Sequence, residues 1–208
     1  MKKLTCFVYA ILAGVAISIG GIVFLACENK YFGCVMFSIG LYAVCTLGLN
    51  LFTGKVCYVL DNPPGYILDV VIIWLGNLVG SLAMGLLVRN TRLLDTVCQT
   101  AVNVANVKLG DGLLSVFLLA ILCNIMIYLG VENFKKNPHE VGKYVGVVMA
   151  VAVFVICGFE HCVANMFYFS AAGAWSLRTV GYLLVMTAGN TVGGLIFPLA
   201  QKLKDKYE

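Results

Sequence analysis

The sequence predicts an all-α membrane protein in which six transmembrane helices form two three-helix repeats of opposite orientation. Apolar residues make up 61% of the 208 residues and charged residues only 12%, whereas soluble domains average about 45–50% and about 25%. Charge-free runs, each close to the roughly 20 residues that a helix needs to cross a bilayer, occupy 4–27, 31–54, 70–88, 112–131 and 179–200. Similar motifs also recur in the two halves of the chain.

Six spans and one surface helix follow in order along the chain. Span 1, at about 4–27, is too long for the apolar region of a signal peptide. Span 2, at about 31–60, ends at a turn that contains Pro63 and Pro64, because prolines cannot continue a helix. After span 3, the spaced apolar residues of 90–107 predict an amphipathic helix in the membrane interface. Span 3 precedes that helix, at about 66–88. After the helix come span 4 at about 111–131, a polar loop at 132–143, span 5 at about 144–172 and span 6 at about 179–200.

The apolar segment 144–177 is too long for one transmembrane helix. A single helix would be about 51 Å long, more than a tilted helix can accommodate in the bilayer. We therefore expect a break at the polar cluster 158–161, and a second break where 50–55 interrupts the apolar run of span 2. Irregular backbone inside a bilayer survives only where protein buries it or where it lines a watery cavity.

Two pairs of motifs place the same unit in both halves. Residues 76–82 and 189–195 share the pattern Gly-Asn-x-Val-Gly, and 10–14 resembles 120–124, with offsets of 110–113 positions. The same offset carries the first expected break onto the second. A three-span unit that is repeated once must be inverted in the membrane, and such repeats build sites near the bilayer midplane. The prediction is one transmembrane domain, 1–208, with repeat halves at about 1–88 and 111–208.

The distribution of basic residues predicts the orientation. The formal net charge of +4 is too small to indicate a nucleic-acid partner. Six spans place on one side the N-terminal segment, the loop 132–143 and the C-terminal tail, which together hold eight lysines against five basic residues on the other side. By the positive-inside rule, both termini are cytoplasmic, which predicts a multi-pass protein of the plasma or inner membrane.

The nine cysteines are interpreted as small hydrophobic residues. Most lie in the middle of spans, and no Cys-x-x-Cys motif occurs. We expect neither disulfides, a metal site nor a cofactor.

Glu160 and His161 are the only ionisable residues deep within a span. Ionisable residues are costly in hydrocarbon, so both are functional candidates. If the second half of span 5 is helical, His161 and Asn165 share a face at i,i+4. We expect these two to face a conduit and Glu160 to point elsewhere, where it supports the broken backbone or binds a cation. We predict that this cation is Lys108, because a buried carboxylate without a partner is expensive. The alternative is that His161 only packs helices together.

Several motifs resemble the formate/nitrite transporter family. Residues 158–166, Gly-Phe-Glu-His-Cys-Val-Ala-Asn-Met, are similar to its GFEHxxANM signature, and Leu51-Phe52-Thr53-Gly54 is similar to its LFTG(N) signature. The two Gly-Asn-x-x-Gly segments and 122–124 also resemble that family, in the same order. Lys55 departs from the pattern, because the family usually has asparagine there.

The resemblance implies an aquaporin-like protomer with broken helices 2 and 5, assembled as a homopentamer in the lipid bilayer with one pore in each protomer. It implies a polar lining and two apolar constrictions, one of Leu41, Leu51 and Phe52 and the other of Phe37 and Phe154. The implied polar residues are Thr53, Asn124 and His161, and the implied cation is Lys108. Asn165 and Glu160, singled out above, and Lys55, which departs from the family pattern, complete the candidate site.

These features predict a channel for small monovalent anions such as formate, nitrite or hydrosulfide, or for their conjugate acids. A basic residue attracts the anion, apolar constrictions make dehydration costly, and an imidazole can change charge near neutral pH. One alternative is a channel for a neutral solute such as water or ammonia, although no Asn-Pro-Ala box is present. The other is a membrane enzyme, which the chain does not favour because His139, the only other histidine, lies in a polar loop.

Overall fold

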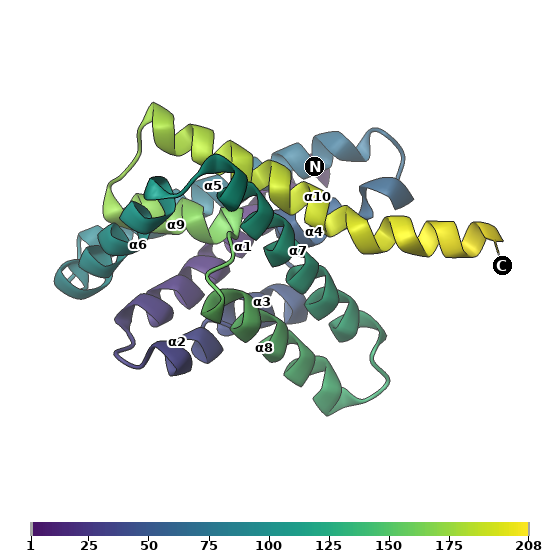
Figure 1. Cartoon of the computed structure of the whole chain (residues 1–208), viewed down its shortest axis with the longest axis horizontal. Helices are drawn as coiled ribbons and strands as arrows, with labels where there is room; N and C mark the ends of the chain where they lie inside the picture. The colour runs from purple at the N-terminus through teal and green to yellow at the C-terminus, as the bar shows by residue number, and fades with distance from the viewer. Residues whose placement is uncertain (1, 208) are drawn as a thin grey trace.

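The computed structural model describes residues 2–207, which are helical throughout apart from turns and short links. Figure 1 shows the helices crossing one another as a bundle, with α10 running past the others to the C-terminus. The elements are α1 (Lys2–Ala26), α2 (Lys30–Met36), α3 (Ile39–Thr46), α4 (Phe52–Lys55), η1 (Val56–Asp61), α5 (Tyr66–Arg89), η2 (Leu94–Cys98), α6 (Gln99–Gly110), α7 (Leu113–Lys136), α8 (Glu140–Ile156), α9 (Cys162–Ala172) and α10 (Leu177–Tyr207).

Four of the helices, α1, α5, α7 and α10, are long and apolar enough to cross a membrane. They correspond to predicted spans 1, 3, 4 and 6. Two of them extend further than predicted, because α7 continues through Lys136 into the expected polar loop and α10 continues through the charged tail to Tyr207. Lysines in the last turn favour both extensions through the helix dipole. In α7 the ion pair between Lys136 and Glu132, at 2.5 Å, adds i,i+4 support.

The chain segments predicted as spans 2 and 5 are each made of shorter helices. Helix α3 ends at Thr46 and α4 begins at Phe52, while α8 ends at Ile156 and α9 begins at Cys162. The first interruption therefore lies at 47–51, before the predicted 50–55. The residues Phe52–Lys55 are helical because the chain has already turned at a glycine.

The two interruptions have the same backbone geometry. Gly48 and Gly158 have φ of 64° and 69°, the left-handed conformation that ends a helix in the Schellman motif. After each glycine, the next N–H donates back across the glycine, from Leu49 to the Val44 carbonyl and from Phe159 to the Phe154 carbonyl. All these pairs are 110 positions apart.

An asparagine fixes each interruption in place. The side-chain amide of Asn77 donates to the carbonyls of Ala10 and Asn50, and its oxygen accepts from the Phe52 N–H. The amide of Asn190 makes the corresponding three bonds, to the carbonyls of Ala120 and Glu160 and from the Cys162 N–H, all within 2.9 Å. Each buried asparagine thus ties a long helix to the start of a short one.

The glycines three residues after these asparagines let the long helices approach closely. A Cβ at Gly80 would lie 2.2 Å from the Ile11 carbonyl oxygen, and one at Gly193 would lie 2.1 Å from the Ile121 carbonyl oxygen. Small residues therefore bring α5 against α1 and α10 against α7. This agrees with a packing role for the glycines of the repeated motif, whereas its asparagines do more than pack.

The segment 90–107, predicted as an interfacial helix, is helical from Leu94 onward, as η2 followed by α6, which together run from Leu94 to Gly110. Helix α6 packs on α9 through its buried residues Ala101 and Ala105. Its last turn carries Lys108. The helix therefore brings a cation to the start of α9, where the candidate site lies.

Candidate functional site

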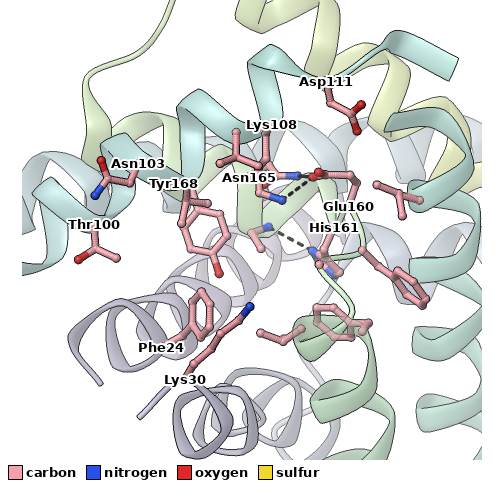
Figure 2. Close-up of a pocket in the computed structure, with 18 residues that line it drawn as sticks. Phe24, Lys30, Thr100, Asn103, Lys108, Asp111, Glu160, His161, Asn165 and Tyr168 are labelled. Atoms are coloured by element: carbon pink, nitrogen blue, oxygen red, sulfur yellow. Dashed lines mark hydrogen bonds and ion pairs between the residues drawn. The ribbon is translucent and has the colours of Figure 1, made fainter. Parts of the chain in front are cut away.

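Several charged and polar side chains lie around a cavity of about 380 Å³ between α6, α9 and the interruption before α9. Figure 2 shows Lys108, Asn165, Glu160 and His161 along one wall, with Phe24 and Lys30 across from them. We call this space the α9 cavity. It is lined by Phe24, Lys30, Thr100, Asn103, Val104, Val107, Lys108, Asp111, Leu119, Phe154, Val155, Gly158, Phe159, Glu160, His161, Ala164, Asn165 and Tyr168.

Glu160 is held by a cation and an amide. Its Oε2 accepts from Lys108 Nζ at 2.7 Å and from Asn165 Nδ2 at 2.7 Å, as the dashed lines in Figure 2 show. The Glu160 and Lys108 side chains are only 4% and 12% exposed. The predicted pairing of Lys108 with Glu160 is confirmed, and each of these two buried side chains has the other as its partner.

The expectation that Glu160 points away from His161 and Asn165 is wrong, because all three line the α9 cavity. The i,i+4 argument assumed that His161 is helical, but its φ and ψ are −95° and 110°. His161 instead has an extended backbone and precedes the first residue of α9. Its side chain therefore does not share a helix face with Asn165. Asn165 turns toward Glu160 and leaves its Oδ1 without a partner among the described residues.

The His161 ring is fixed by contacts at both nitrogens. Its Nδ1 accepts from the Ala164 N–H at 3.1 Å, which caps α9. Its Nε2 lies 3.0 Å from the Thr53 hydroxyl, which comes from α4 in the other half of the chain. A neutral ring whose Nδ1 accepts must carry its hydrogen on Nε2. In that form Nε2–H donates to Thr53, and Thr53 and His161 are each buried.

Two aromatic rings cover the histidine. Phe154 stacks on His161 with ring centroids 5.6 Å apart, and Phe37 meets Phe154 edge to face at 5.8 Å. Phe37 and Phe154 are 1% and 3% exposed. The lining of the α9 cavity therefore changes from charged side chains to the aromatic ring of Phe154 beside His161.

A second cavity of about 140 Å³ lies beside α4, and we call it the α4 cavity. Leu51 and Gly54 line it on either side of Thr53 in the chain. Since Thr53 contacts His161, and His161 lines the α9 cavity, the two cavities approach each other at the Thr53–His161 contact. The α4 cavity is lined by Val44, Cys45, Gly48, Leu49, Leu51, Gly54, Lys55, Tyr58, Val131, Phe134 and Lys135.

Five predicted lining residues line neither described cavity, namely Phe37, Leu41, Phe52, Thr53 and Asn124. Leu41 and Phe52 are buried in the apolar core. Asn124 is fully buried and donates to the Asn190 carbonyl at 2.6 Å, while its Oδ1 has no partner among the described residues. The Asn124 side chain is thus directed to the backbone of Asn190 in α10.

Asn77 and Asn190 were missed as site residues. Their glycine neighbours favoured a packing interpretation of the whole motif. The available signal was the recurrence of an asparagine at the same place in both halves, because a buried amide needs several hydrogen-bond partners. Tyr168, whose ring also lines the α9 cavity, carried no signal in the sequence.

This arrangement supports passage and binding rather than covalent chemistry. Aromatic rings, a hydroxyl–imidazole contact and lysines lie around two cavities that approach each other at that contact. The described residues hold no group of three metal-ligating side chains. The fold and the site therefore define a membrane channel or transporter.

The comparisons with known proteins identify the family. The profile of the formate/nitrite transporter family matches residues 1–201, and the chain belongs to that family. It is 33% identical over 195 residues to the "Probable formate transporter" of Methanothermobacter thermautotrophicus, covering 80% of this chain and 71% of that protein. It is 29% identical over 206 residues to "Formate channel FocA" of Haemophilus influenzae, covering 81% and 71%.

Solved structures have the same fold. A "Pentameric formate channel with formate bound" matches with a TM-score of 0.83 at 24% identity, over 100% of this chain and 98% of that one. An "FNT family ion channel" matches with a TM-score of 0.82 at 25% identity, over 93% and 87%. The chain is thus an anion channel of the formate/nitrite transporter family and not an enzyme.

Proposed function

We propose that each protomer holds one pore, which passes formate, nitrite, hydrosulfide or a similar small monovalent anion, or its conjugate acid. The carrying observation is the buried Thr53–His161 contact, because it lies between the two cavities. His161 lines the α9 cavity, and Leu51 and Gly54, on either side of Thr53 in the chain, line the α4 cavity. The names of the relatives, which are formate channels and a nitrite transporter, support this range of substrates.

In this proposal, the apolar rings form a dehydration barrier. Phe37 and Phe154 act on the side of the α9 cavity, and Leu51 with Leu41 and Phe52 acts on the side of the α4 cavity. Moving an isolated anion into such surroundings is very costly, while a neutral acid pays far less. The rings therefore favour small solutes that can shed water or accept a proton.

Thr53 and His161 then provide hydrogen-bond donors at the narrowest place. An anion that enters between them can accept from His161 Nε2–H and from the Thr53 hydroxyl, replacing the 3.0 Å contact that the two make with each other. Such donors partly repay the loss of hydration, since hydrogen bonds to a charged acceptor are the strong ones. Lys108 attracts the anion into the α9 cavity, and Glu160, which also accepts from Asn165, holds Lys108 in place.

We further infer that the two halves are inverted in the membrane, with six spans of which the second and fifth are broken, and that both termini are cytoplasmic. The matched glycine turns and asparagine contacts, 110–113 positions apart, support the repeat. The lysines of α1 and α10, and Lys135, Lys136 and Lys143 on either side of the α7–α8 link, support the orientation. A homopentamer in the plasma or inner membrane is inferred from the related pentameric channel.

A flux panel in proteoliposomes tests the function. Vesicles with and without the protein would receive formate, nitrite, hydrosulfide or lactate at two pH values, with water and ammonia permeation measured in parallel. We expect protein-dependent flux of at least one anion. Water or ammonia flux without any anion flux would replace the proposal with a neutral-solute channel.

A further inference from the structure

The two cavities differ in their balance of charge. The α9 cavity is lined by two basic and two acidic residues, namely Lys30, Lys108, Asp111 and Glu160. The described lining of the α4 cavity contains two lysines, Lys55 and Lys135, and no acidic residue. A cavity with uncompensated positive charge and apolar walls concentrates anions.

Lys55 is a cation without a counter-ion. Its side chain is half-buried, and within residues 2–207 it takes part in no ion pair. Its backbone is fully engaged, because the Lys55 N–H donates to the Leu51 carbonyl and the Lys55 carbonyl accepts from the Tyr66 hydroxyl. The ammonium group is therefore positioned by α4 while its own charge remains available.

The relation between the two halves explains the missing counter-ion. The offset of 110 places Lys55 where the other half has Asn165, and Asn50 where it has Glu160. In the second half, Asn165 and the carboxylate of Glu160 bind each other. In the first half, the neutral Asn50 donates to the Cys6 carbonyl at 3.2 Å and offers Lys55 no negative charge.

Lys135 is also incompletely neutralised. Its Nζ donates to the Tyr58 hydroxyl at 2.6 Å and lies 3.9 Å from the centre of the Tyr58 ring. The Tyr58 hydroxyl in turn donates to Glu132. Glu132, however, is also paired with Lys136 at 2.5 Å. The Glu132 carboxylate therefore forms a direct ion pair with Lys136 and reaches Lys135 only through the Tyr58 hydroxyl.

We propose that Lys55 and Lys135 form an anion-binding site in the α4 cavity, and that this site binds anions more tightly than the α9 cavity does. This inference rests on the proposed function and deepens it, because it places the stronger binding step on the cytoplasmic side in the orientation proposed above. About 140 Å³ accommodates a three- or four-atom anion with its last waters, since each water occupies about 30 Å³ in the liquid. Tyr58 holds Lys135 at the rim, and Leu51 forms the floor that leads to Thr53.

Thermal unfolding of the purified, detergent-solubilised full chain tests the site without any transport. Sodium nitrite and sodium formate would be titrated against sodium gluconate at constant ionic strength, for the wild type, Lys55→Asn, Lys55→Arg and Lys135→Gln. The wild-type Tm should rise with nitrite or formate and saturate. In Lys55→Asn the half-saturating concentration should rise about tenfold, the change expected for the loss of one charge-assisted contact, while Lys55→Arg should retain the response.

The Tm measured in gluconate, without a bound anion, gives a second test of the site. Lys55→Asn should not lower the Tm in gluconate, because it removes repulsion between two lysines rather than a stabilising contact. Lys143→Gln is the matched control, since it removes one positive charge outside both cavities; its nitrite response should equal that of the wild type. An unchanged response in Lys55→Asn and Lys135→Gln, or an equal loss in Lys143→Gln, would overturn the site.

The two proposals fail in different ways. If the wild type binds nitrite through Lys55 but vesicles show no anion flux, the site stands and the proposed function fails. If vesicles show flux but the thermal response does not depend on Lys55 or Lys135, the function stands and the site fails.

Discussion

His161 does two separable things, because one ring nitrogen caps α9 and the other faces Thr53. The cap requires only an acceptor near the Ala164 N–H, which many side chains can provide. The position facing Thr53 is where an imidazole differs from other caps, since its second ring nitrogen lies 3.0 Å from the Thr53 hydroxyl. Adding a proton at Nδ1, however, would require the cap hydrogen bond to break.

We predict that His161→Asn keeps the fold and changes how flux depends on pH. Asparagine is among the best helix caps, so the oligomer should remain intact, while the substituted site can no longer change its charge. Flux would be measured from about pH 5 to 8 at matched protein density. Thr53→Ala is the companion variant, and it should weaken conduction less because it removes one hydroxyl only. Superimposable pH profiles for His161→Asn and the wild type would assign the histidine to packing alone.

We predict that Glu160→Gln lowers both the yield of folded oligomer and the flux. The substitution leaves Lys108 buried without its carboxylate, and breaking a buried pair from one side costs about 3–5 kcal/mol. Size-exclusion chromatography and thermal unfolding in detergent would measure the loss. The double variant Lys108→Met/Glu160→Gln should recover part of the stability but not the flux. Equal stability of all three proteins would show that the pair is not structural.

At the scale of helices, close approach depends on where glycines fall. We predict that Gly193→Ala destabilises the protein by about 1–3 kcal/mol, as overpacking does, because the new Cβ would meet the Ile121 carbonyl at 2.1 Å. Gly181→Ala in the same helix is the control, since a Cβ there has no described neighbour within 4 Å. The control should be neutral or stabilising by up to about 1 kcal/mol. Chemical unfolding in mixed micelles would compare the two, and equal effects would contradict the close-packing argument.

Span positions could be predicted from the sequence because hydropathy and charge determine them residue by residue. The ends of helices could not, as α7 and α10 show. Their charged last turns look like loops in composition, but lysines there interact favourably with the helix dipole, and in α7 Lys136 also pairs with Glu132 one turn away. The first break, predicted at 50–55, was placed too late in the chain. Its position depends on the φ of Gly48, and a glycine in an apolar run gives no sign of its conformation.

Part of the candidate site was accessible from the sequence. Glu160 and His161 stand out because an apolar span has few reasons to contain them, and the partner Lys108 followed from the cost of an unpaired carboxylate. The roles of Asn77 and Asn190 were not accessible, because a single side chain makes three contacts with segments far apart in the chain. The placement of Asn165 beside Glu160 was missed for a local reason, the extended backbone of His161.

For the whole molecule, we predict a pentamer with a separate conduit in each protomer. The two cavities and their junction lie within one chain, so no pore between subunits is needed for passage. Native mass spectrometry in detergent should show five copies. A permeation path on the symmetry axis, detected by retained flux after the Thr53–His161 junction is blocked with bulky substitutions, would contradict it.

The matched turns at Gly48 and Gly158 also bear on the ancestry of the chain. Because the two turns and the asparagine contacts that hold them match, we infer that a three-helix polypeptide once paired with a second copy of itself, each copy supporting the other's backbone. While both copies came from one gene, a change at either position altered both ends of the passage together. Fusion of duplicated genes released that constraint, so that one half could acquire a histidine where the other keeps Leu51, and one a lysine where the other keeps Asn165. The polarity of the passage is thus a product of duplication.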